Sequence, residues 1–298
     1  MKAIQKLLCA TAIVSAGSAS ATDLEVMHWW TSGGEAAAVA EFAKAFDATG
    51  HKWVDAAIAG GEAARAVMVS RLTGGDPMGA FQFNHGRQAE ELIEAGLLRD
   101  ITDIAEAEGW KDIVNPPSLL DACTVDGRIY CAPVNIHSWQ WLWVGHKAFT
   151  DAGVAVPTNW AEFAAAAPAL DAAGKLPLAM GQQGWQQSGA FNVMMASLVS
   201  GDVFMSVYGD KDTDVAGGSQ VATVFQAAAA ARDMAAKSTV QNWNDATNLV
   251  ITGQAGGQIM GDWAQGEFAV AGAVAGQDYS CLPGLGTNPR LGTGGDAF

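Results

Sequence analysis

The sequence of 298 residues has few charged side chains, and basic ones are especially scarce. Lysine and arginine together number 16, against 31 aspartates and glutamates, which gives a formal charge of −15. An acidic surface repels phosphate backbones, so the composition argues against nucleic acid as a partner. Hydrophobic residues make up 50% of the chain, so a buried core is feasible and disorder is disfavoured.

Long apolar runs and metal-ligand spacings are also missing. No stretch approaches the roughly 20 apolar residues that a transmembrane helix needs. No two cysteines have the C-x-x-C spacing of a zinc site, and the histidines are scattered along the chain. The phosphate-binding loop, the dinucleotide fingerprint and the serine-hydrolase elbow are absent as well. We therefore expect no metal centre and no cofactor.

The first residues have the pattern of a secretory signal peptide. The string MKAIQK carries two lysines, an apolar run follows, and the small residues Ala19-Ser20-Ala21 form a cleavage site. We predict that residues 1–21 are removed, that Thr22 begins the mature chain, and that the protein is exported to the periplasm. Cys9 leaves a lipid anchor as an alternative, although residues 6–8 lack the small side chains of a lipobox.

Three cysteines follow the predicted cleavage site. Residues 123–131 read as a β-hairpin with Asp126-Gly127 at its turn. A three-residue loop would place Cys123 opposite Cys131, and an oxidising compartment permits a disulfide. We predict that these two cysteines are bonded and that Cys281 is a buried free thiol.

The first half of the mature chain alternates between strand and helix patterns. Residues 24–30 read as a strand, 31–34 as a turn and 35–46 as an alanine-rich helix. Two more strands near 53–58 and 80–84 alternate with helices near 62–73 and 88–95. This alternation predicts an α/β domain with a largely parallel sheet, whose ligand site lies at the carboxyl ends of the strands.

A second domain is expected after a crossover at residues 133–135, because the chain length suits two domains. A β-prone run at 139–144 opens it. The later elements are predicted as a helix at 157–170, a strand at 176–180, a long helix from Phe191, a helix at 221–236 and a strand at 257–261.

Tryptophan is abundant, with 11 residues, and its placement is informative. Five tryptophans fall at predicted strand ends or loops, each with acids or amides nearby: Trp29, Trp30, Trp185, Trp243 and Trp263. A pyranose presents apolar C–H faces and hydroxyl groups, so its site needs flat aromatic walls and hydrogen-bonding neighbours. Packing in the core is the competing interpretation for any one of them. Trp53, Trp110 and Trp160 are interpreted as structural.

An enzyme is the alternative from a different class. Glu35 paired with Asp262 or Asp296 could serve acid/base cleavage of a glycoside. Sequence spacing does not fix the distance between these carboxyl groups, and acids are abundant enough for chance pairs. We favour a binding protein without catalytic activity over a periplasmic carbohydrate hydrolase or lyase.

Four strings give the sequence a specific resemblance: EVMHWWTSGGE at 25–35, YCAPVNIH at 130–137, GQQGWQ at 181–186 and QIMGDWA at 258–264. Together they resemble the extracellular sugar-binding components of ABC importers, and among them the bacterial glucose/mannose-binding proteins. The resemblance implies an α/β fold of type II-like periplasmic binding proteins, with two lobes joined by a hinge. Lobe 1 would span residues 22–133, lobe 2 residues 134–293, and residues 294–298 would begin a second crossover.

The resemblance also implies a site in the cleft between the lobes. Trp29, Trp30, Glu35 and His85 would form one wall, with His85 standing where many relatives have lysine. Trp185 and Trp243 would form the other wall, and Asp296 would contribute from the second crossover.

The implied ligand is a monosaccharide such as glucose, with an oligosaccharide or a polyol as the alternatives. The implied partners are the permease subunits of an ABC importer, and a monomer is expected. Relatives continue beyond residue 298, so we expect a fold that is incomplete at this end, with apolar faces uncovered.

Overall fold

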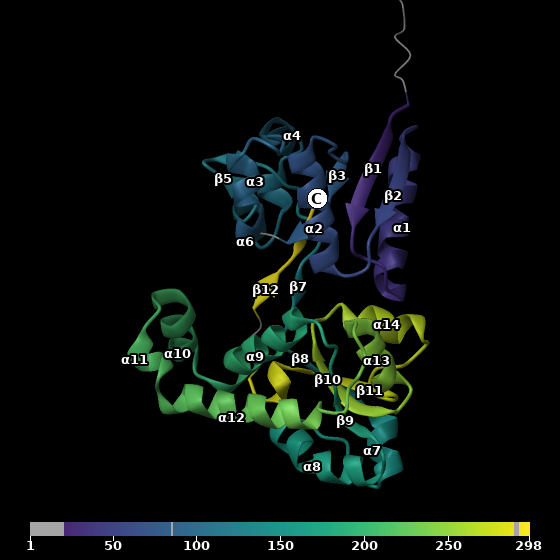
Figure 1. The fold of residues 1–298 in the computed structure, drawn as a ribbon, viewed down its shortest axis with the longest axis vertical. Coiled ribbons are helices and arrows are strands. Elements are labelled where there is room, and N and C mark those ends of the chain that lie inside the picture. The colour runs from purple at the N-terminus through teal and green to yellow at the C-terminus, as the bar shows by residue number, and fades with distance from the viewer. Residues whose placement is uncertain (1–20, 85, 289–291) are drawn as a thin grey trace, which may run out of the picture.

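The computed structural model describes residues 21–84, 86–288 and 292–298, and these residues form two α/β bodies joined by a narrow connection (Figure 1). We keep the predicted boundaries as names, lobe 1 for residues 22–133 and lobe 2 for residues 134–293. No helix in the described ranges is long and apolar enough to cross a membrane.

Lobe 1 is built on a three-stranded parallel sheet of order β2-β1-β3. Its strands are β1 (Asp23–His28), β2 (Lys52–Ala57) and β3 (Ala80–Phe81), and the helices α1 (Gly33–Asp47) and α2 (Gly61–Gly74) connect them. Met27 of β1 packs with Met68 and Leu72 of α2 in the core of this lobe. The predicted alternation of strand and helix is therefore confirmed.

Two strand predictions in lobe 1 are wrong for the same reason. Backbone groups that would continue the predicted strand form hydrogen bonds with other partners. The strand predicted over 24–30 ends at His28, because side chains take over the next two amides. Trp29 N–H donates to Gln82 Oε1 and Trp30 N–H to His28 Nδ1. The strand predicted over 80–84 divides at Gln82 into β3 and β4 (Phe83–Asn84), since β4 pairs with a different partner, β13 (Asp296–Ala297).

The rest of lobe 1 consists of short elements. They are η1 (Arg87–Ala89), α3 (Glu90–Glu94), α4 (Thr102–Ala107), α5 (Trp110–Ile113), α6 (Ser118–Asp121), β5 (Thr124–Val125) and β6 (Arg128–Ile129).

The predicted disulfide between Cys123 and Cys131 is confirmed, with a Cα–Cα distance of 5.2 Å. The predicted three-residue loop is wrong. Val125 pairs with Arg128, so the loop holds only Asp126 and Gly127. Both have positive φ, 50° and 76°, which is the requirement of a two-residue type I′ turn.

Lobe 2 holds a four-stranded sheet of order β11-β8-β10-β9. Its strands are β8 (Trp141–Gly145), β9 (Leu176–Ala179), β10 (Ala255–Met260) and β11 (Tyr279–Pro283). All six residues of the central strand β10 are buried. Gly257 allows this, because a Cβ there would lie 2.5 Å from Trp143 O and 2.7 Å from Phe163 Cε2.

Lobe 2 also contains many helices, some packed around this sheet and some projecting away from it (Figure 1). They are α7 (His146–Ala152), α8 (Trp160–Ala172), α9 (Gly184–Leu198), α10 (Gly201–Met205), η2 (Ser206–Asp210), α11 (Thr213–Ala216), α12 (Ser219–Met234), α13 (Trp243–Ile251), α14 (Ala264–Val270) and η3 (Gly284–Gly286). The prediction that the long helix starts at Phe191 is wrong. α9 starts at Gly184, because Gln186, Gly189 and Ala190 are already buried against the lobe.

Cys281 is free, as predicted, but it is only partly buried. It lies on β11, which is an edge strand that pairs with β8 alone within the described sheet. One side of an edge strand faces away from the sheet, so the prediction of a buried thiol is wrong.

Two chain segments run side by side between the lobes. β7 (His137–Ser138) pairs antiparallel with β12 (Thr293–Gly294), and Pro133 forms a bridge with Ala297. Ala132 and Phe298 also exchange backbone hydrogen bonds of 2.7 and 3.1 Å. The connection is therefore a two-stranded ribbon, which we call the crossover ribbon.

Candidate ligand-binding cleft

A cleft of about 840 Å³ lies between the two lobes. Lobe 1 lines it with the β1–α1 turn and the start of α2, and lobe 2 with α9, the start of α13 and the β10–α14 turn. The crossover ribbon closes one side. This volume falls in the range of small-molecule sites, about 300–1,000 Å³.

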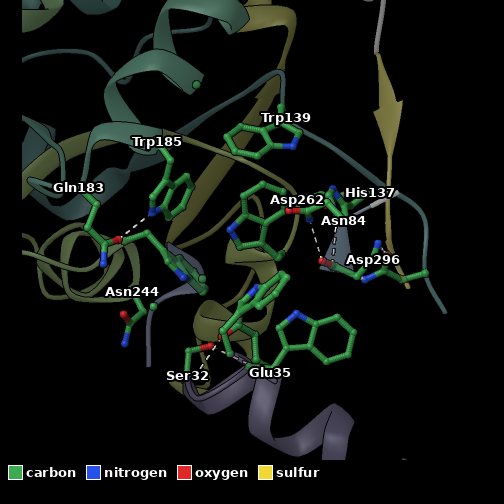
Figure 2. A pocket seen from close by; sticks show the side chains of 18 of the residues that line it. Ser32, Glu35, Asn84, His137, Trp139, Gln183, Trp185, Asn244, Asp262 and Asp296 are labelled. Atoms are coloured by element: carbon green, nitrogen blue, oxygen red, sulfur yellow. Dashed lines mark hydrogen bonds and ion pairs between the residues drawn. The ribbon is translucent and has the colours of Figure 1, made fainter. Parts of the chain in front are cut away.

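The structure brings six of the seven predicted site residues to this cleft. Trp29, Trp30 and Glu35 line it from lobe 1, Trp185 and Trp243 from lobe 2, and Asp296 from the crossover ribbon. His85 lies outside the described residues. Figure 2 shows Glu35 on one side of the cleft and Trp185 on the opposite side.

The tryptophan pair of lobe 1 is held by buried polar side chains. His28 Nδ1 accepts from Trp30 N–H at 3.2 Å, so its Nε2 carries the hydrogen that is donated to Asp55 at 2.7 Å. Trp30 is only 8% exposed and packs against Phe42 and Phe298. Trp30 therefore offers the cleft little area, whereas the more exposed Trp29 can present its ring.

Glu35 sits in the first turn of α1 as part of a capping box. Its backbone N–H donates to Ser32 Oγ at 3.4 Å, and its Oε2 accepts from Ser32 N–H at 3.2 Å. The pKa of Glu35 is raised to about 7, mainly by burial and to a smaller extent by the charges of Asp296 and Glu267, while the hydrogen bonds with Ser32 oppose the shift. Glu35 can therefore donate or accept a hydrogen bond near neutral pH.

Arg65 is a cleft residue that the sequence analysis missed. Its guanidinium lies 5.2 Å from the ring centroid of Trp29, within cation–π range, and 3.5 Å from Asn84 Oδ1. Burial lowers the pKa of Arg65. Arg65 lies inside α2, and a single arginine within a helix is usually interpreted as solvent-exposed. The sequence signal that could have found it is its position one turn after Gly61, where α2 begins beyond the carboxyl end of β2.

Lobe 2 contributes a group of four tryptophans. Trp263 is its centre, edge-to-face with Trp139 at 4.8 Å and with Trp243 at 6.5 Å, and Trp139 meets Trp185 at 5.7 Å. Such edge-to-face pairs are a favoured aromatic geometry. We call these four residues the tryptophan wall.

Trp139 was not predicted as a site residue, and Trp263 was one of the five candidate tryptophans but was not assigned to either wall of the cleft. Trp139 was read as part of a strand, but β8 starts at Trp141 and leaves Trp139 on the segment facing the cleft. Trp263 follows the central strand in the QIMGDWA string, and this position at a strand end is what marked it as a candidate.

Amides hold the tryptophan wall in place. Trp185 Nε1 donates to Gln183 Oε1 at 2.8 Å, and Gln183 Nε2 donates to Asn242 Oδ1 at 3.3 Å. Asp262 Oδ2 accepts from Ser138 N–H at 2.9 Å, and burial raises the pKa of Asp262. These bonds tie the start of α9, the approach to α13 and the β10–α14 turn to fixed neighbours.

Asp296 connects both lobes through its two carboxylate oxygens. Oδ1 accepts from Asn84 of lobe 1 at 3.0 Å, and Oδ2 accepts from Asn135 at 3.1 Å. His137 Nε2 lies 3.4 Å from the same Oδ2. Asp296 is 5% exposed, so most of its hydrogen-bonding capacity serves the crossover ribbon (Figure 2).

The chemistry of the cleft is that of stacking and hydrogen bonding. Tryptophan faces suit apolar C–H surfaces, and Glu35, Arg65 and the cleft amides suit hydroxyl groups. Among the described residues, no group of three or more metal-ligating side chains lies close enough to hold an ion.

Comparison with known proteins identifies the family. The model for bacterial extracellular solute-binding proteins matches residues 30–297. The chain belongs to this family. This solute-binding protein is 35% identical over 279 residues to a probable sugar-binding periplasmic protein of Brucella melitensis, covering 93% of this chain and 66% of the relative. It is 34% identical over 294 residues to a protein of the same description from Rhizobium meliloti, covering 98% and 70%.

Solved structures show the same two-domain fold. A protein from a study of xylan utilization by Caldanaerobius polysaccharolyticus superposes with a TM-score of 0.75 at 17% identity, covering 92% of this chain and 72% of that one. The solute receptor AcbH, described as having an exclusive preference for β-D-galactopyranose, gives 0.72 at 19% identity, covering 93% and 71%. The predicted two-lobed α/β architecture of this solute-binding protein is thereby confirmed.

Proposed function

We propose that this protein captures a sugar in the periplasm for an ABC importer, and that the sugar is glucose or a similar monosaccharide. The observation that carries the proposal is the cleft itself, where the tryptophan wall of lobe 2 faces Trp29, Glu35 and Arg65 of lobe 1. A pyranose ring offers apolar faces to the tryptophans and equatorial hydroxyls to the charged groups. The descriptions of the relatives from Brucella melitensis and Rhizobium meliloti support a sugar as the ligand.

Binding would work by closure of the two lobes on the sugar. A ligand shifts the protein toward the closed state only if it contacts that state better. A ring held between Trp243 of lobe 2 and Glu35 of lobe 1 satisfies this condition, because its contacts require both lobes. The closed monomer would then be presented to the permease subunits.

Catalysis is not part of the proposal. Both oxygens of Asp296 accept amide hydrogen bonds, and Asp262 Oδ2 accepts from Ser138 N–H. The two carboxylates considered as catalytic partners of Glu35 therefore have structural hydrogen bonds of their own. Incubation of pure protein with maltose or cellobiose should release no monosaccharide. Release of glucose that tracks the purified protein would revive the hydrolase alternative.

Titration with a panel of sugars tests the function. Tryptophan fluorescence and calorimetry should report saturable binding of glucose, mannose or galactose, because the ligand contacts the tryptophan wall. A disaccharide, a longer oligosaccharide and a polyol complete the panel. Saturable binding of only the last three would overturn the monosaccharide proposal, and no binding of any of them would overturn the sugar proposal.

A further inference from the structure

Two helices from different lobes touch beside the cleft. Figure 1 shows α1 of lobe 1 reaching down to α14 of lobe 2. Gly34 and Gly266 meet there, and a Cβ on Gly34 would lie 2.8 Å from the Cα and 2.9 Å from the carbonyl carbon of Gly266. The two backbones are therefore in direct contact, and even alanine at Gly34 forces a shift.

A carboxylate of lobe 2 completes the N-terminus of α1. The first N–H groups of a helix have no partner within the helix. In α1, the N–H groups of Glu35 and Ala36 donate to Ser32, whereas Gly34 N–H donates to Glu267 Oε1 of α14 at 2.9 Å. The helix dipole favours an anion at this end. Lobe 2 thus supplies a hydrogen-bond acceptor to lobe 1.

We propose that the Gly34–Gly266 contact and the Glu267 hydrogen bond form an interlobe latch, in which Glu267 is a positioning residue that holds the cleft closed. Glu267 does not line the cleft, so it acts through closure and not through the ligand. Its bond to Gly34 N–H exists only while the lobes are together. An interaction made in one state alone shifts the equilibrium toward that state.

The latch also affects Glu35, the proposed ligand-binding residue that follows Gly34 in the chain. The negative charge of Glu267 raises the pKa of Glu35, although burial is the larger cause. Closure therefore favours the protonated form of Glu35, which can donate a hydrogen bond to the ligand.

The first test needs no ligand and uses glycine-to-alanine variants. Gly34→Ala and Gly266→Ala place a methyl group in the contact, and Gly266→Ala is the milder because its Cβ would lie 3.1 Å from Gly34 Cα. Alanine favours helices more than glycine does, so α1 and α14 are not weakened as helices. The control is Gly74→Ala in α2, where a Cβ meets nothing within 4 Å.

The readout is the distance between spin labels on α4 and α8, one in each lobe, together with the thermal midpoint. We expect a smaller closed population for Gly34→Ala, an intermediate one for Gly266→Ala and no change for Gly74→Ala, with unchanged or raised midpoints. Equal closed populations in the wild type and Gly34→Ala would overturn the latch.

The second test measures binding kinetics and rests on the proposed function, with glucose as the probe. Loss of a charge-assisted hydrogen bond in Glu267→Ala should raise the dissociation rate about five- to tenfold and leave the association rate within about a factor of two. Glu267→Gln keeps an acceptor oxygen and should raise the dissociation rate less than Glu267→Ala does. The control is Glu41→Gln on the exposed face of α1.

The two tests separate the two proposals. Should the wild type bind no glucose, the proposed monosaccharide function fails, and the ligand-free distances still decide the latch. A dissociation rate in Glu267→Ala equal to that of Glu41→Gln would overturn the latch even where glucose binds tightly.

Discussion

The two lobes reach the same cleft from differently built bodies. The sheet of lobe 2 has a central strand that is buried along its whole length, and its core includes the large side chains of Phe149, Phe163 and Leu142. The parallel sheet of lobe 1 has three strands, one of them only two residues long, and a disulfide ties its hairpin. The tryptophan wall belongs to lobe 2, with its heavily packed core. The charged residues Glu35 and Arg65 belong to lobe 1, with its smaller sheet.

This difference indicates a division of work. An aromatic stacking surface must stay flat and in place, which a large core provides. Glu35 and Arg65 stand instead near the starts of α1 and α2, where a capping box holds Glu35 and the ring of Trp29 lies beside Arg65.

Core truncations should lower the free energy of unfolding of each lobe independently of the other. Phe163→Ala leaves a cavity beside β10 of lobe 2 and should lower the free energy of unfolding of that lobe by about 3–5 kcal/mol. Met68→Ala, equally buried in lobe 1, should cost about 2–5 kcal/mol. Denaturant unfolding, followed by probes placed in each lobe, should show each variant shifting the transition of its own lobe. The control, Phe225→Ala, removes a side chain that is 61% exposed and should change little. Identical shifts at both probes in both variants would contradict the separation.

Tryptophan truncations should weaken sugar binding from either lobe. Trp243→Ala removes part of the tryptophan wall and should cost about 2–4 kcal/mol of binding free energy, about one and a half to three decades in affinity. Trp29→Ala should fall in the same range, whereas Trp30→Ala should also lower stability because Trp30 packs on Phe42. Calorimetric titration with glucose measures the losses.

The control for these truncations is Trp110→Ala, which lies in lobe 1 away from the cleft. The assignment of the tryptophans to the site would be wrong if Trp29→Ala, Trp30→Ala and Trp243→Ala, all folded, kept glucose affinity within about a factor of two of the wild type.

The disulfide should matter to lobe 1 alone. The double variant Cys123→Ser/Cys131→Ser opens a loop with a sequence separation of 8. Loop-closure entropy predicts a loss of about 2–3 kcal/mol in the free energy of unfolding. The transition of lobe 1 should move to lower denaturant and that of lobe 2 should not. Cys281→Ser, which alters a free thiol, is the control. A shift of the lobe 2 transition as large as that of lobe 1 would refute the local effect.

The pH dependence of the free energy of unfolding should reveal the raised pKa of Glu35. Its folded pKa of about 7 lies above the ordinary value of 4.5, so the folded state binds the extra proton between these values. The stability from this group is full below about pH 4.5 and is lost as pH rises through 7. Relative to Glu35→Gln, the wild type should lose on the order of 1–2 kcal/mol between pH 5 and pH 8. Parallel pH profiles of unfolding midpoints for the two proteins would contradict the buried acid.

Local patterns were enough to predict much of lobe 1. The alternation of strand and helix, the Asp126-Gly127 turn and the disulfide all follow from signals within a few residues of each other. Where the prediction failed, a distant partner decided the outcome. β1 ends at His28 because the side chain of Gln82 takes the Trp29 amide, and no pattern near β1 contains that information.

The same distinction between local signals and distant partners applies to the residues of the candidate site. Trp29, Glu35 and Trp243 were found from aromatic and acidic residues near element ends and from the family resemblance. Arg65 and Trp139 were missed because only the tertiary fold turns them toward the cleft. Arg65 reads locally as an exposed helix residue, and Trp139 reads as a strand residue until the true start of β8 is known.

The crossover ribbon sets the way in which the lobes can move. Its segments are joined by the β7–β12 pairing, the Ala132–Phe298 bonds and the side chain of Asp296. Two hydrogen-bonded strands resist bending within their own plane, because one strand would have to lengthen as the other shortened. They bend readily out of that plane and twist about their length. The lobes are therefore expected to open by bending of the crossover ribbon out of its plane and by twisting about its length, so that ligand entry and release follow these two angular motions.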